Sequence, residues 1–416
     1  MRRFGLLGER LAHSFSPIIH AELGDYEYRL YEKKPEDVEH FLRNGVFDGL
    51  NVTIPYKKTV IPFCGSLSKT AHDIGSVNTI LRLADGSLYG DNTDYYGFSY
   101  LIEKTKTNPA ANPAAGKIIV LGSGGSSLTV QAVLRHMGAN EVVVISRYGA
   151  DNYENIEKHR DAIMIINTTP VGMYPNNGFS PIRELEIFHN CRGVIDLIYN
   201  PIRTELLLQA DKRGMIGVGG LAMLVAQAKR AAELFTGEPI PDRRIEAITS
   251  KIARLTQNIV LIGMPGCGKT SIGAALAIRM GREFADTDEL IEKSAGKNIP
   301  AIFSEDGEER FRKWEAKILQ DLCKKSGLII ATGGGVVKQP ENQRIIKQNG
   351  IIVFLERDLD QLSLAGRPLS ERDGVKALAA ERLPIYKEWS EHTVTVRGIE
   401  ETAEDIYMKL YGGKQI

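Results

Sequence analysis

The sequence predicts an α/β protein with two nucleotide-binding units in one chain. Two short apolar runs, Lys117–Leu121 and Ile259–Ile262, each lead into a glycine-rich turn and then into a helical stretch. That order is typical of strand–turn–helix units that bind phosphate groups at the start of the helix. The length of 416 residues leaves room for about three domains.

The composition is that of an ordinary globular protein, with 43% hydrophobic and 25% charged residues. Lys plus Arg and Asp plus Glu both number 52, unlike the basic excess of proteins that bind nucleic acids. No apolar run is long enough for a signal peptide or a membrane span. We therefore expect a cytoplasmic protein without nucleic-acid or membrane partners, as a monomer or homodimer. The cysteines are far apart, which indicates a reducing compartment and no zinc site; they are Cys64, Cys191, Cys267 and Cys323.

Two segments mark the domain boundaries. Thr105–Pro113 is rich in proline, asparagine and alanine and predicts a connection into the first nucleotide unit. After the turn at Gly237–Asp242 the spacing predicts one amphipathic helix, which needs a partner for its apolar face. The second nucleotide unit begins right after it, at Asn258, without a long flexible linker. The apolar face of the helix consists of Ile245, Ile248, Ile252 and Leu255.

The first glycine-rich turn, Gly122–Ser127, is a degraded form of the dinucleotide pattern G-x-G-x-x-G. By itself it is equally compatible with a plain glycine-rich turn. After the next strand, Val142–Ile145, Arg147 stands where NAD-binding proteins usually have an acidic residue. An arginine there suits the 2′-phosphate of NADP, and a solvated surface arginine is the alternative. The pattern favours NADP over NAD.

Polar residues upstream of this turn cluster in four short segments, Ser14–Pro17, Asn51–Lys57, Gly75–Thr79 and Gly90–Asp94. In the second segment polar and apolar residues alternate, which predicts a strand with one polar face. Taken singly, each segment is typical of a turn or a helix cap.

Taken in order, the segments resemble the shikimate dehydrogenase family over roughly residues 1–255. They carry the motifs S-x-S-P, N-V-T-x-P-x-K, G-x-V-N-T and G-x-N-T-D-x-x-G. Further matches follow at Asn167–Met173, Asp196–Pro201 and Gly219–Gln227. Two positions depart from the family: Ser76, where alanine is usual, and Ser146, where asparagine is usual.

This resemblance implies reversible, NADP-dependent reduction of 3-dehydroshikimate to shikimate. Lys57 and Asp94 would be the acid/base pair, because the ketone oxygen must gain a proton as hydride reaches the carbon. The residues implied to bind substrate are Ser14, Ser16, Thr53, Lys57, Asn78, Asp94, Tyr199 and Gln227. Those implied to bind NADP(H) are Gly122, Gly124, Gly125, Ser126, Ser127, Arg147 and Gly220.

The second glycine-rich turn, Gly263–Thr270, is a complete P-loop between an apolar strand and a helix. Its backbone N–H groups would cradle phosphates, Lys269 would contact the β- and γ-phosphate oxygens, and Thr270 would join Mg²⁺. The motif alone does not separate a small-molecule kinase from a GTPase, an ATPase motor or a nucleotide kinase.

Residues downstream of the P-loop narrow that choice. Asp286 and Asp288 would share one face of an extended segment, one supporting Mg²⁺ and the other facing an acceptor hydroxyl. Arg312 and Glu315 would pair at i, i+3 on a helix. A buried strand ends in Gly333–Gly335, which permits close approach of a small substrate. The guanine-reading pattern N-K-x-D is absent, which argues against a GTPase.

From about Asn258 onward these features resemble the shikimate kinase family in order and spacing. The resemblance implies that Asp288 binds the ring hydroxyls and takes the proton of the attacking one, while Asp286 and Thr270 support Mg²⁺. Arg312 and Arg382 would clamp the substrate carboxylate, the latter from a helical segment that Glu381–Tyr386 opens. The floor of the substrate site would be Gly333, Gly334 and Gly335.

ATP would be held by the P-loop and by one lid arginine, Arg367. A second lid arginine near the adenine has no clear match at Asp360, and Arg357 is the candidate. The residues implied to bind ATP are Gly263, Met264, Pro265, Gly266, Cys267, Gly268, Lys269, Thr270, Ser271 and Arg367.

The combined prediction is a bifunctional enzyme using NADP(H), ATP and Mg²⁺ in two consecutive steps toward chorismate and the aromatic amino acids. An open α/β substrate domain (1–105 with 218–255) and a Rossmann NADP domain (106–217) would precede a P-loop domain like the nucleoside-monophosphate kinases (256–416). One alternative is a metabolite-responsive regulator without turnover. It would be expected to lack Lys57, Asp94, Lys269 or Asp288, and all four are present. The other is a quinate-preferring dehydrogenase, which Arg147 and the attached kinase disfavour.

Overall fold

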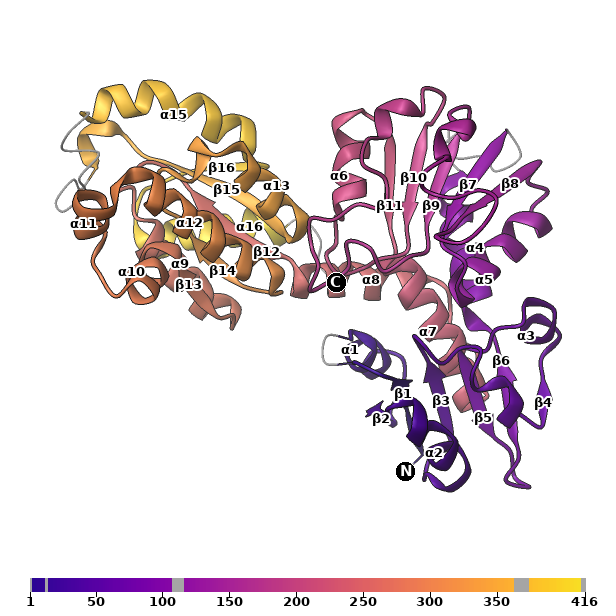
Figure 1. Ribbon diagram of the computed structural model, residues 1–416. Helices are drawn as coiled ribbons and strands as arrows, with labels where there is room; N and C mark the ends of the chain where they lie inside the picture. Colours follow the sequence, from indigo (N-terminus) through magenta and orange to yellow (C-terminus); the bar gives the residue numbers. More distant parts are fainter. Residues whose placement is uncertain (1, 12–13, 107–115, 363–373, 413–416) are drawn as a thin grey trace. The chain divides into compact units, whose positions relative to one another are not determined.

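The computed structural model describes residues 2–11, 14–106, 116–362 and 374–412. The chain separates into two compact units, called here the first unit and the second unit (Figure 1). The first unit comprises residues 1–173 and 179–253, and the second comprises residues 174–178 and 254–416.

The N-terminal sheet of the first unit has six strands in the order β2-β1-β3-β5-β6-β4. Strand β1 runs parallel to β2 and β3, whereas β5 runs antiparallel to β3 and β6. Leu7, Leu50 and Ile80 are fully buried in its core. The strands are β1 (Arg3–Gly8), β2 (Glu27–Glu32), β3 (Gly49–Val52), β4 (Ser66–Leu67), β5 (Thr79–Arg82) and β6 (Leu88–Asp91). The helices along this sheet are α1 (Ser16–Ala21), α2 (Val38–Asn44) and α3 (Lys69–Ile74).

The other sheet of the first unit is entirely parallel, with the order β11-β10-β9-β7-β8. Its helices include α5 (Gly125–His136) and α6 (Glu205–Lys212). Because parallel strands end at one edge, the turns after β7 and β8 are neighbours, as the sequence predicts for a dinucleotide site. The strands are β7 (Lys117–Leu121), β8 (Glu141–Ile145), β9 (Met164–Asn167), β10 (Gly193–Asp196) and β11 (Ile216–Gly219).

Two long helices, α4 (Thr93–Lys106) and α7 (Leu221–Thr236), pack on each other within the first unit. The approach is close because position 97 is glycine: a Cβ there would lie 2.8 Å from the carbonyl oxygen of Met223. Asp94 enters the unit on the first turn of α4 and Gln227 on α7. The pairing of these helices therefore brings the two predicted substrate residues into one region.

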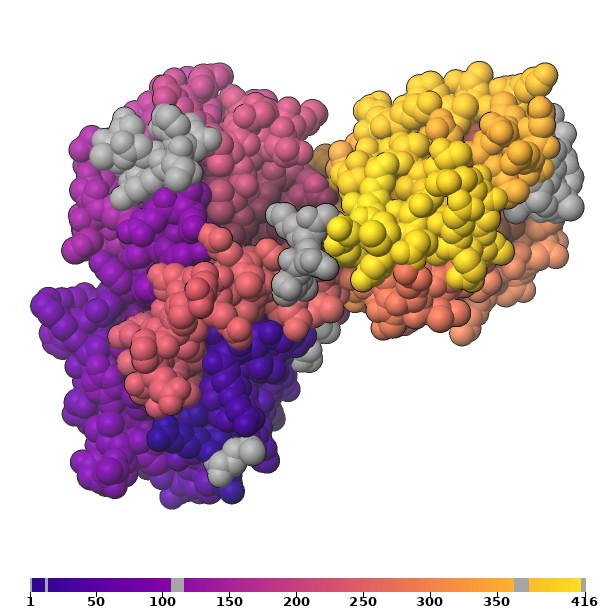
Figure 2. Space-filling view, turned by 180° about the vertical axis from the view of Figure 1, so that it is seen from behind, coloured from indigo at the N-terminus to yellow at the C-terminus, as the bar shows by residue number. Residues whose placement is uncertain are grey.

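The predicted amphipathic helix is α8 (Arg243–Thr256). Ile245, Ile248 and Ile252 are buried against the first unit, in one cluster with Phe15. Leu255 lies on the same side of the helix but is 47% exposed, because it is on the last turn, beyond the packed stretch. Figure 2 shows residues 221–253 lying beside the N-terminal segment of the first unit.

The second unit is built on a parallel sheet with the order β13-β14-β12-β15-β16, so the P-loop strand β12 is central. The strands are β12 (Asn258–Ile262), β13 (Phe284–Asp286), β14 (Ile329–Ala331), β15 (Gly350–Glu356) and β16 (His392–Thr395). The helices are α9 (Lys269–Met280), α10 (Thr287–Ala295), α11 (Ile299–Ala301), α12 (Gly307–Lys324), α13 (Pro340–Asn349), α15 (Val375–Trp389) and α16 (Ile399–Tyr411).

One helix of this unit begins earlier than predicted. Glu381–Tyr386 lies within α15, which begins at Val375 and carries Pro384 in its interior. Proline usually ends or kinks a helix, and that signal favoured a helix starting beside it.

Among the described residues, no helix combines the length and the apolar character needed to cross a membrane.

Candidate active sites

The centre of the first site is an ion pair between Lys57 and Asp94. The Lys57 ammonium lies 2.5 Å from Asp94 Oδ2, and the two side chains are only 14% and 8% exposed. Asp94 is on the first turn of α4, where the helix dipole favours a carboxylate. Lys57 also donates to Ser126 Oγ at 3.5 Å, which places the pair beside the glycine-rich turn. The predicted acid/base residues therefore face the predicted cofactor turn.

A group of buried amides and hydroxyls adjoins this pair. Asn78 Nδ2 donates to Gln227 Oε1 at 3.3 Å and to Thr93 Oγ1 at 3.1 Å. The backbone N–H of Thr93 donates to Asn78 Oδ1 at 2.6 Å, which fixes the orientation of that amide. Asn78 and Gln227 are 2% and 8% exposed. Such groups suit the hydroxyls of a small polyol.

Hydroxyl groups form another side of the site. Ser14 Oγ donates to Ser16 Oγ at 3.1 Å. Burial raises the pKa of Tyr199. The Tyr199 ring lies 5.3 Å from the ring of Phe15. Thr53, one residue beyond β3, is half-buried. The structure thus places Tyr199 beside the segment that carries Ser14 and Ser16.

The glycine-rich turn after β7 has room for a phosphate at the start of α5. Gly122 has φ +104°, and a Cβ on Gly124 would meet nothing within 4 Å. Gly125 is close-packed, because a Cβ there would lie 2.8 Å from Ser76 Oγ. The hydroxyl of Ser127, in contrast, is buried and accepts from Gln131 Nε2 at 3.0 Å. Ser127 therefore holds the helix rather than facing a ligand with its side chain.

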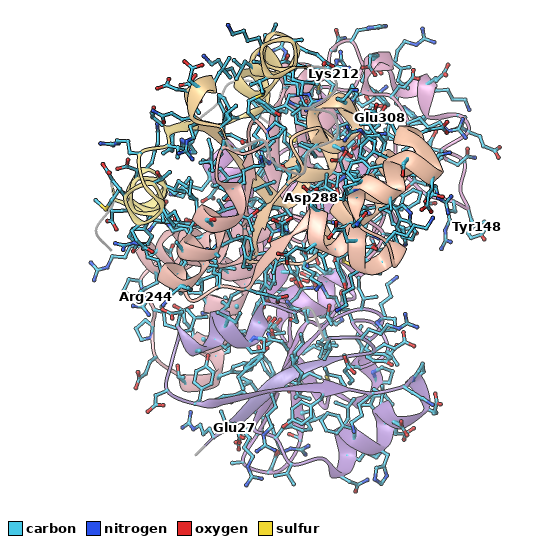
Figure 3. The ribbon with its side chains drawn as sticks, turned by 90° about the vertical axis from the view of Figure 1, so that its left-hand side faces the viewer. Glu27, Tyr148, Lys212, Arg244, Asp288 and Glu308 are labelled. Carbon is cyan, nitrogen blue, oxygen red and sulfur yellow. The ribbon has the colours of Figure 1, made fainter. Side chains whose placement is uncertain are left out.

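Two further residues predicted to bind the cofactor are Gly220, which is closely packed, and Arg147, which is exposed. Gly220 directly precedes α7, and a Cβ there would overlap the carbonyl of Leu197, so only glycine fits. Arg147 follows β8 and is exposed, with its guanidinium 5.7 Å from the ring of Tyr148. Tyr148 is 88% exposed and projects away from the ribbon (Figure 3). An exposed guanidinium at this strand end fits a phosphate group on the adenosine ribose.

The P-loop of the second unit encloses its own lysine. Gly263, Gly266 and Gly268 have φ values of +149°, +80° and +103°, which only glycine adopts readily. Lys269 is 8% exposed, and its ammonium donates to the carbonyls of Gly263 and Met264, both at 2.9 Å. Cys267 Sγ is 3.8 Å away. A bound phosphate would compete with these carbonyls for the lysine.

The hydroxyl of Thr270 donates to Asp286 Oδ2 at 2.7 Å, and Asp286 Oδ1 accepts from the backbone N–H of Asp288 at 2.9 Å. One prediction is wrong here. The two aspartates do not share an extended segment, because β13 ends at Asp286 and Asp288 lies in the first turn of α10. Asp286 is the cap of that helix, a role that aspartate favours and that ends the strand early.

Asp288 carries a perturbed carboxyl group. Burial, with the nearby charge of Asp286, raises the pKa of Asp288 to about 6. Its Oδ1 is buried and has no hydrogen-bond partner. A Cβ on Gly333 would lie 2.7 Å from that oxygen and 2.9 Å from Glu315 Oε1. The two carboxylates thus converge over a glycine that leaves space for a ligand.

Two buried arginines complete the second site. Arg312 donates to Glu315 Oε2 at 2.7 Å and to Glu308 Oε1 at 3.2 Å, which confirms the predicted i, i+3 pair. Arg382 is 1% exposed and donates to the carbonyl of Gly334 at 3.2 Å. Arg312 Nε, Arg382 Nε and Arg382 Nη2 are buried without partners. Unpaired guanidinium donors of this kind suit an anionic ligand such as a carboxylate.

The second site also contains two residues that the sequence did not predict as site residues, Glu315 and Tyr386. Burial raises the pKa of Glu315 to about 7, and its side chain is 1% exposed. The Tyr386 hydroxyl donates to the carbonyl of Gly334 and thereby supports the glycine floor. Arg367 lies outside the described residues. Arg357 Nη1 lies 3.9 Å from the Cβ position of Gly268, at the P-loop.

Comparisons with known proteins agree with this geometry. Residues 6–80 match the family model for the shikimate dehydrogenase substrate binding domain, and residues 265–410 match the model for shikimate kinase. A shikimate dehydrogenase (NADP(+)) of Clostridium perfringens is 35% identical over 274 residues, which are 61% of this chain and 98% of that protein. The chain belongs to the shikimate dehydrogenase family.

Solved structures match a larger part of the chain than the family model of the substrate binding domain. Shikimate dehydrogenase 1 from Peptoclostridium difficile aligns with a TM-score of 0.56 and 34% identity, covering 61% of this chain and 98% of that one. A shikimate 5-dehydrogenase from Thermus thermophilus, solved with NADP(H) and shikimate, aligns with a TM-score of 0.54 and 31% identity, covering 60% and 99%. The chain thus joins a shikimate dehydrogenase to a shikimate kinase domain, which confirms the predicted fusion and its α/β fold class.

Proposed function

We propose that this chain reduces 3-dehydroshikimate to shikimate with NADPH at the first site and phosphorylates shikimate to shikimate 3-phosphate with ATP at the second. The two steps are consecutive, because the product of the first is the substrate of the second. Both serve the synthesis of chorismate and the aromatic amino acids. We assign the enzyme to the cytoplasm as a monomer or homodimer.

The contact between Lys57 and Asp94 beside Ser126 carries the dehydrogenase assignment. NADPH supplies the hydride when bound. The Lys57 ammonium would stabilise the charge that develops on the ketone oxygen and deliver a proton to it. Asp94 holds that ammonium in place and would accept a hydrogen bond from a neighbouring hydroxyl of the substrate. In the reverse direction the same pair would remove the proton from shikimate.

The remaining polar residues orient the ring. Asn78, Gln227 and Thr53 would bind its hydroxyls, with Tyr199 nearby, while Ser14 and Ser16 would bind its carboxylate. The 2′-phosphate of NADPH would pair with the exposed Arg147, and the pyrophosphate would lie at the start of α5. Gly220, at the start of α7, would face the cofactor with its backbone.

Converging polar atoms support the kinase assignment: Asp288 Oδ1, Arg312 Nε and two nitrogens of Arg382 are all buried and unpaired. The arginines would clamp the shikimate carboxylate, and Asp288 would take the proton of the attacking hydroxyl. Lys269 would leave its two carbonyl partners and contact the transferred phosphoryl group. Catalysis would thus rest on positioning and charge neutralisation.

The donors near the P-loop fit Mg²⁺. Thr270 Oγ1 and Asp286 Oδ2 are 2.7 Å apart, and a hydroxyl with one carboxylate is the sparse oxygen set that Mg²⁺ uses together with water and phosphate oxygens. Mg²⁺ would neutralise charge on the phosphates of ATP. Asp286 would hold the ion while its other oxygen keeps Asp288 in place.

One coupled assay tests both halves. The purified chain is given 3-dehydroshikimate and NADPH, with and without ATP·Mg, and products are identified by mass spectrometry. Shikimate should accumulate without ATP, and shikimate 3-phosphate should form with it. Preferred turnover of quinate with NAD, or binding of both metabolites without turnover, would contradict the proposal.

A further inference from the structure

A directed chain of hydrogen bonds crosses the first unit behind the substrate groups. It begins at Tyr28 on the edge strand β2, whose hydroxyl donates to Asn51 Oδ1 at 2.8 Å. Asn51 Nδ2 donates to Thr79 Oγ1 at 3.2 Å. Thr79 in turn lies 3.2 Å from Asn78 Oδ1 and 3.0 Å from Thr93 Oγ1. The chain therefore ends at Asn78, a residue proposed to bind a ring hydroxyl.

The neighbouring groups hold this arrangement. The His20 ring stacks on the Tyr28 ring with centroids 3.9 Å apart and an interplanar angle of 11°. His20 Nδ1 is bonded to the Tyr26 hydroxyl at 2.7 Å, so Tyr26 anchors the histidine from the other side. Asn51, Thr79 and Thr93 are 4%, 0% and 1% exposed, so a lost partner could not be replaced by bulk water.

We propose that Tyr28 is a positioning residue for the first site, which orients Asn51 and, through Thr79, supports the orientation of Asn78. This proposal rests on the proposed dehydrogenase function. Its hydroxyl touches no reacting atom. It fixes the orientation of the Asn51 amide before the substrate arrives, so the groups linked to that amide are already ordered when the ring binds.

The test compares Tyr28→Phe with Tyr26→Phe in the full-length chain. Each change removes one hydroxyl from the same His20 cluster, but only the Tyr28 hydroxyl reaches Asn51. Tyr28→Phe should raise the KM for 3-dehydroshikimate by about 10-fold with kcat nearly unchanged, as expected when uniform binding is lost. Tyr26→Phe should leave this KM unchanged. The KM for NADPH and the kinase rate on supplied shikimate should be unchanged in both.

A double-mutant cycle tests transmission along the chain. Thr79→Val interrupts it beyond Asn51, and the combination with Tyr28→Phe should raise KM by less than the product of the two single effects. Equal KM changes in the two tyrosine variants, or a loss of thermal stability with unchanged KM in Tyr28→Phe, would overturn the proposal. Failure of the proposed function is a different result, since the unmodified chain would then not reduce 3-dehydroshikimate at all.

Discussion

The two sites of this chain manage buried polarity in opposite ways. In the first unit the charged pair is closed: Lys57 and Asp94 satisfy each other, and Asn78 and Gln227 are bonded within one network. In the second unit several polar atoms converge without partners; they are Asp288 Oδ1, Arg312 Nε, Glu315 Oε1, Arg382 Nε and Arg382 Nη2.

The difference follows from the charge that each site is built to bind. A buried donor or acceptor without a partner costs about 1–3 kcal/mol, and more when it is charged. The second unit carries this cost before the substrate arrives, so a carboxylate and a hydroxyl can restore the missing hydrogen bonds. In the first unit the substrate must instead exchange with hydrogen bonds that already exist. We therefore expect ligand binding to stabilise the second unit more.

We expect the largest effect from a substitution that breaks the ion pair between Lys57 and Asp94. Lys57→Ala or Asp94→Asn should lower dehydrogenase kcat by about 10²–10⁴-fold, the usual contribution of a positioned acid/base group. NADPH oxidation with 3-dehydroshikimate measures it. Lys58→Ala, the exposed neighbour, is the matched control, and kinase activity should persist in all three variants. Normal hydride transfer in both site variants would remove the pair from the mechanism.

Opening the arginine clamp should have the next largest effect. Arg382→Ala should lower kcat/KM for shikimate by about 10²–10³-fold, because truncating a buried charge contact costs roughly 2–5 kcal/mol. The KM for ATP should hold, since Arg382 bonds the glycine floor and not the P-loop. Lys387→Ala on the same helix is the exposed control. A rise in the KM for ATP with that for shikimate unchanged would assign Arg382 to the nucleotide.

A buried carboxylate, Asp196, should make the stability of the first unit depend on pH. Asp196 accepts from Asn167, Thr204 and the backbone N–H of Ile198, yet burial raises its pKa from 3.8 to about 6. The folded state therefore holds the proton more tightly than the unfolded state. The stability of the first unit should fall as pH rises from about 4 to about 6, by up to about 3 kcal/mol, and then level off.

Urea unfolding followed by circular dichroism across this pH range measures the effect. Both tryptophans, Trp314 and Trp389, belong to the second unit, so a transition without a change in tryptophan fluorescence reports the first unit. Asp196→Asn should remove its part of the pH dependence. An unchanged slope in that variant would show that Asp196 has an ordinary pKa in the folded protein.

The smallest effect concerns cofactor choice. Arg147→Ala should weaken the binding of NADPH by about 10–100-fold and leave the binding of NADH nearly unaffected. The reason is that a hydrogen bond between charged groups contributes about 1.5–3 kcal/mol to the binding free energy. Fluorescence titration of each cofactor measures this directly. Equal weakening of both would mean that Arg147 holds the loop after β8 rather than a 2′-phosphate.

Much of the fold and of the residue content of both sites follows from local sequence. Glycines that need positive φ fix the P-loop wherever they occur, and a β-branched run before such a turn predicts a parallel strand. Arg312 and Glu315 meet because three residues nearly complete one turn of a helix. Local signals failed where two rules competed: Asp286 ends a strand and caps a helix, and Pro384 lies inside α15 although proline usually breaks helices.

By itself, then, the sequence determined the order of the strands and turns, the two phosphate-binding loops and the residue types of both sites. Tertiary structure alone decided which of those groups are paired. Tyr28 and Asn51 are 23 residues apart, and Asn78 and Gln227 are 149 apart. Their contacts depend on how β2, β3 and the α4–α7 pair assemble. Pairing sets the free energy of a buried polar group, and distance along a chain carries no information about pairing.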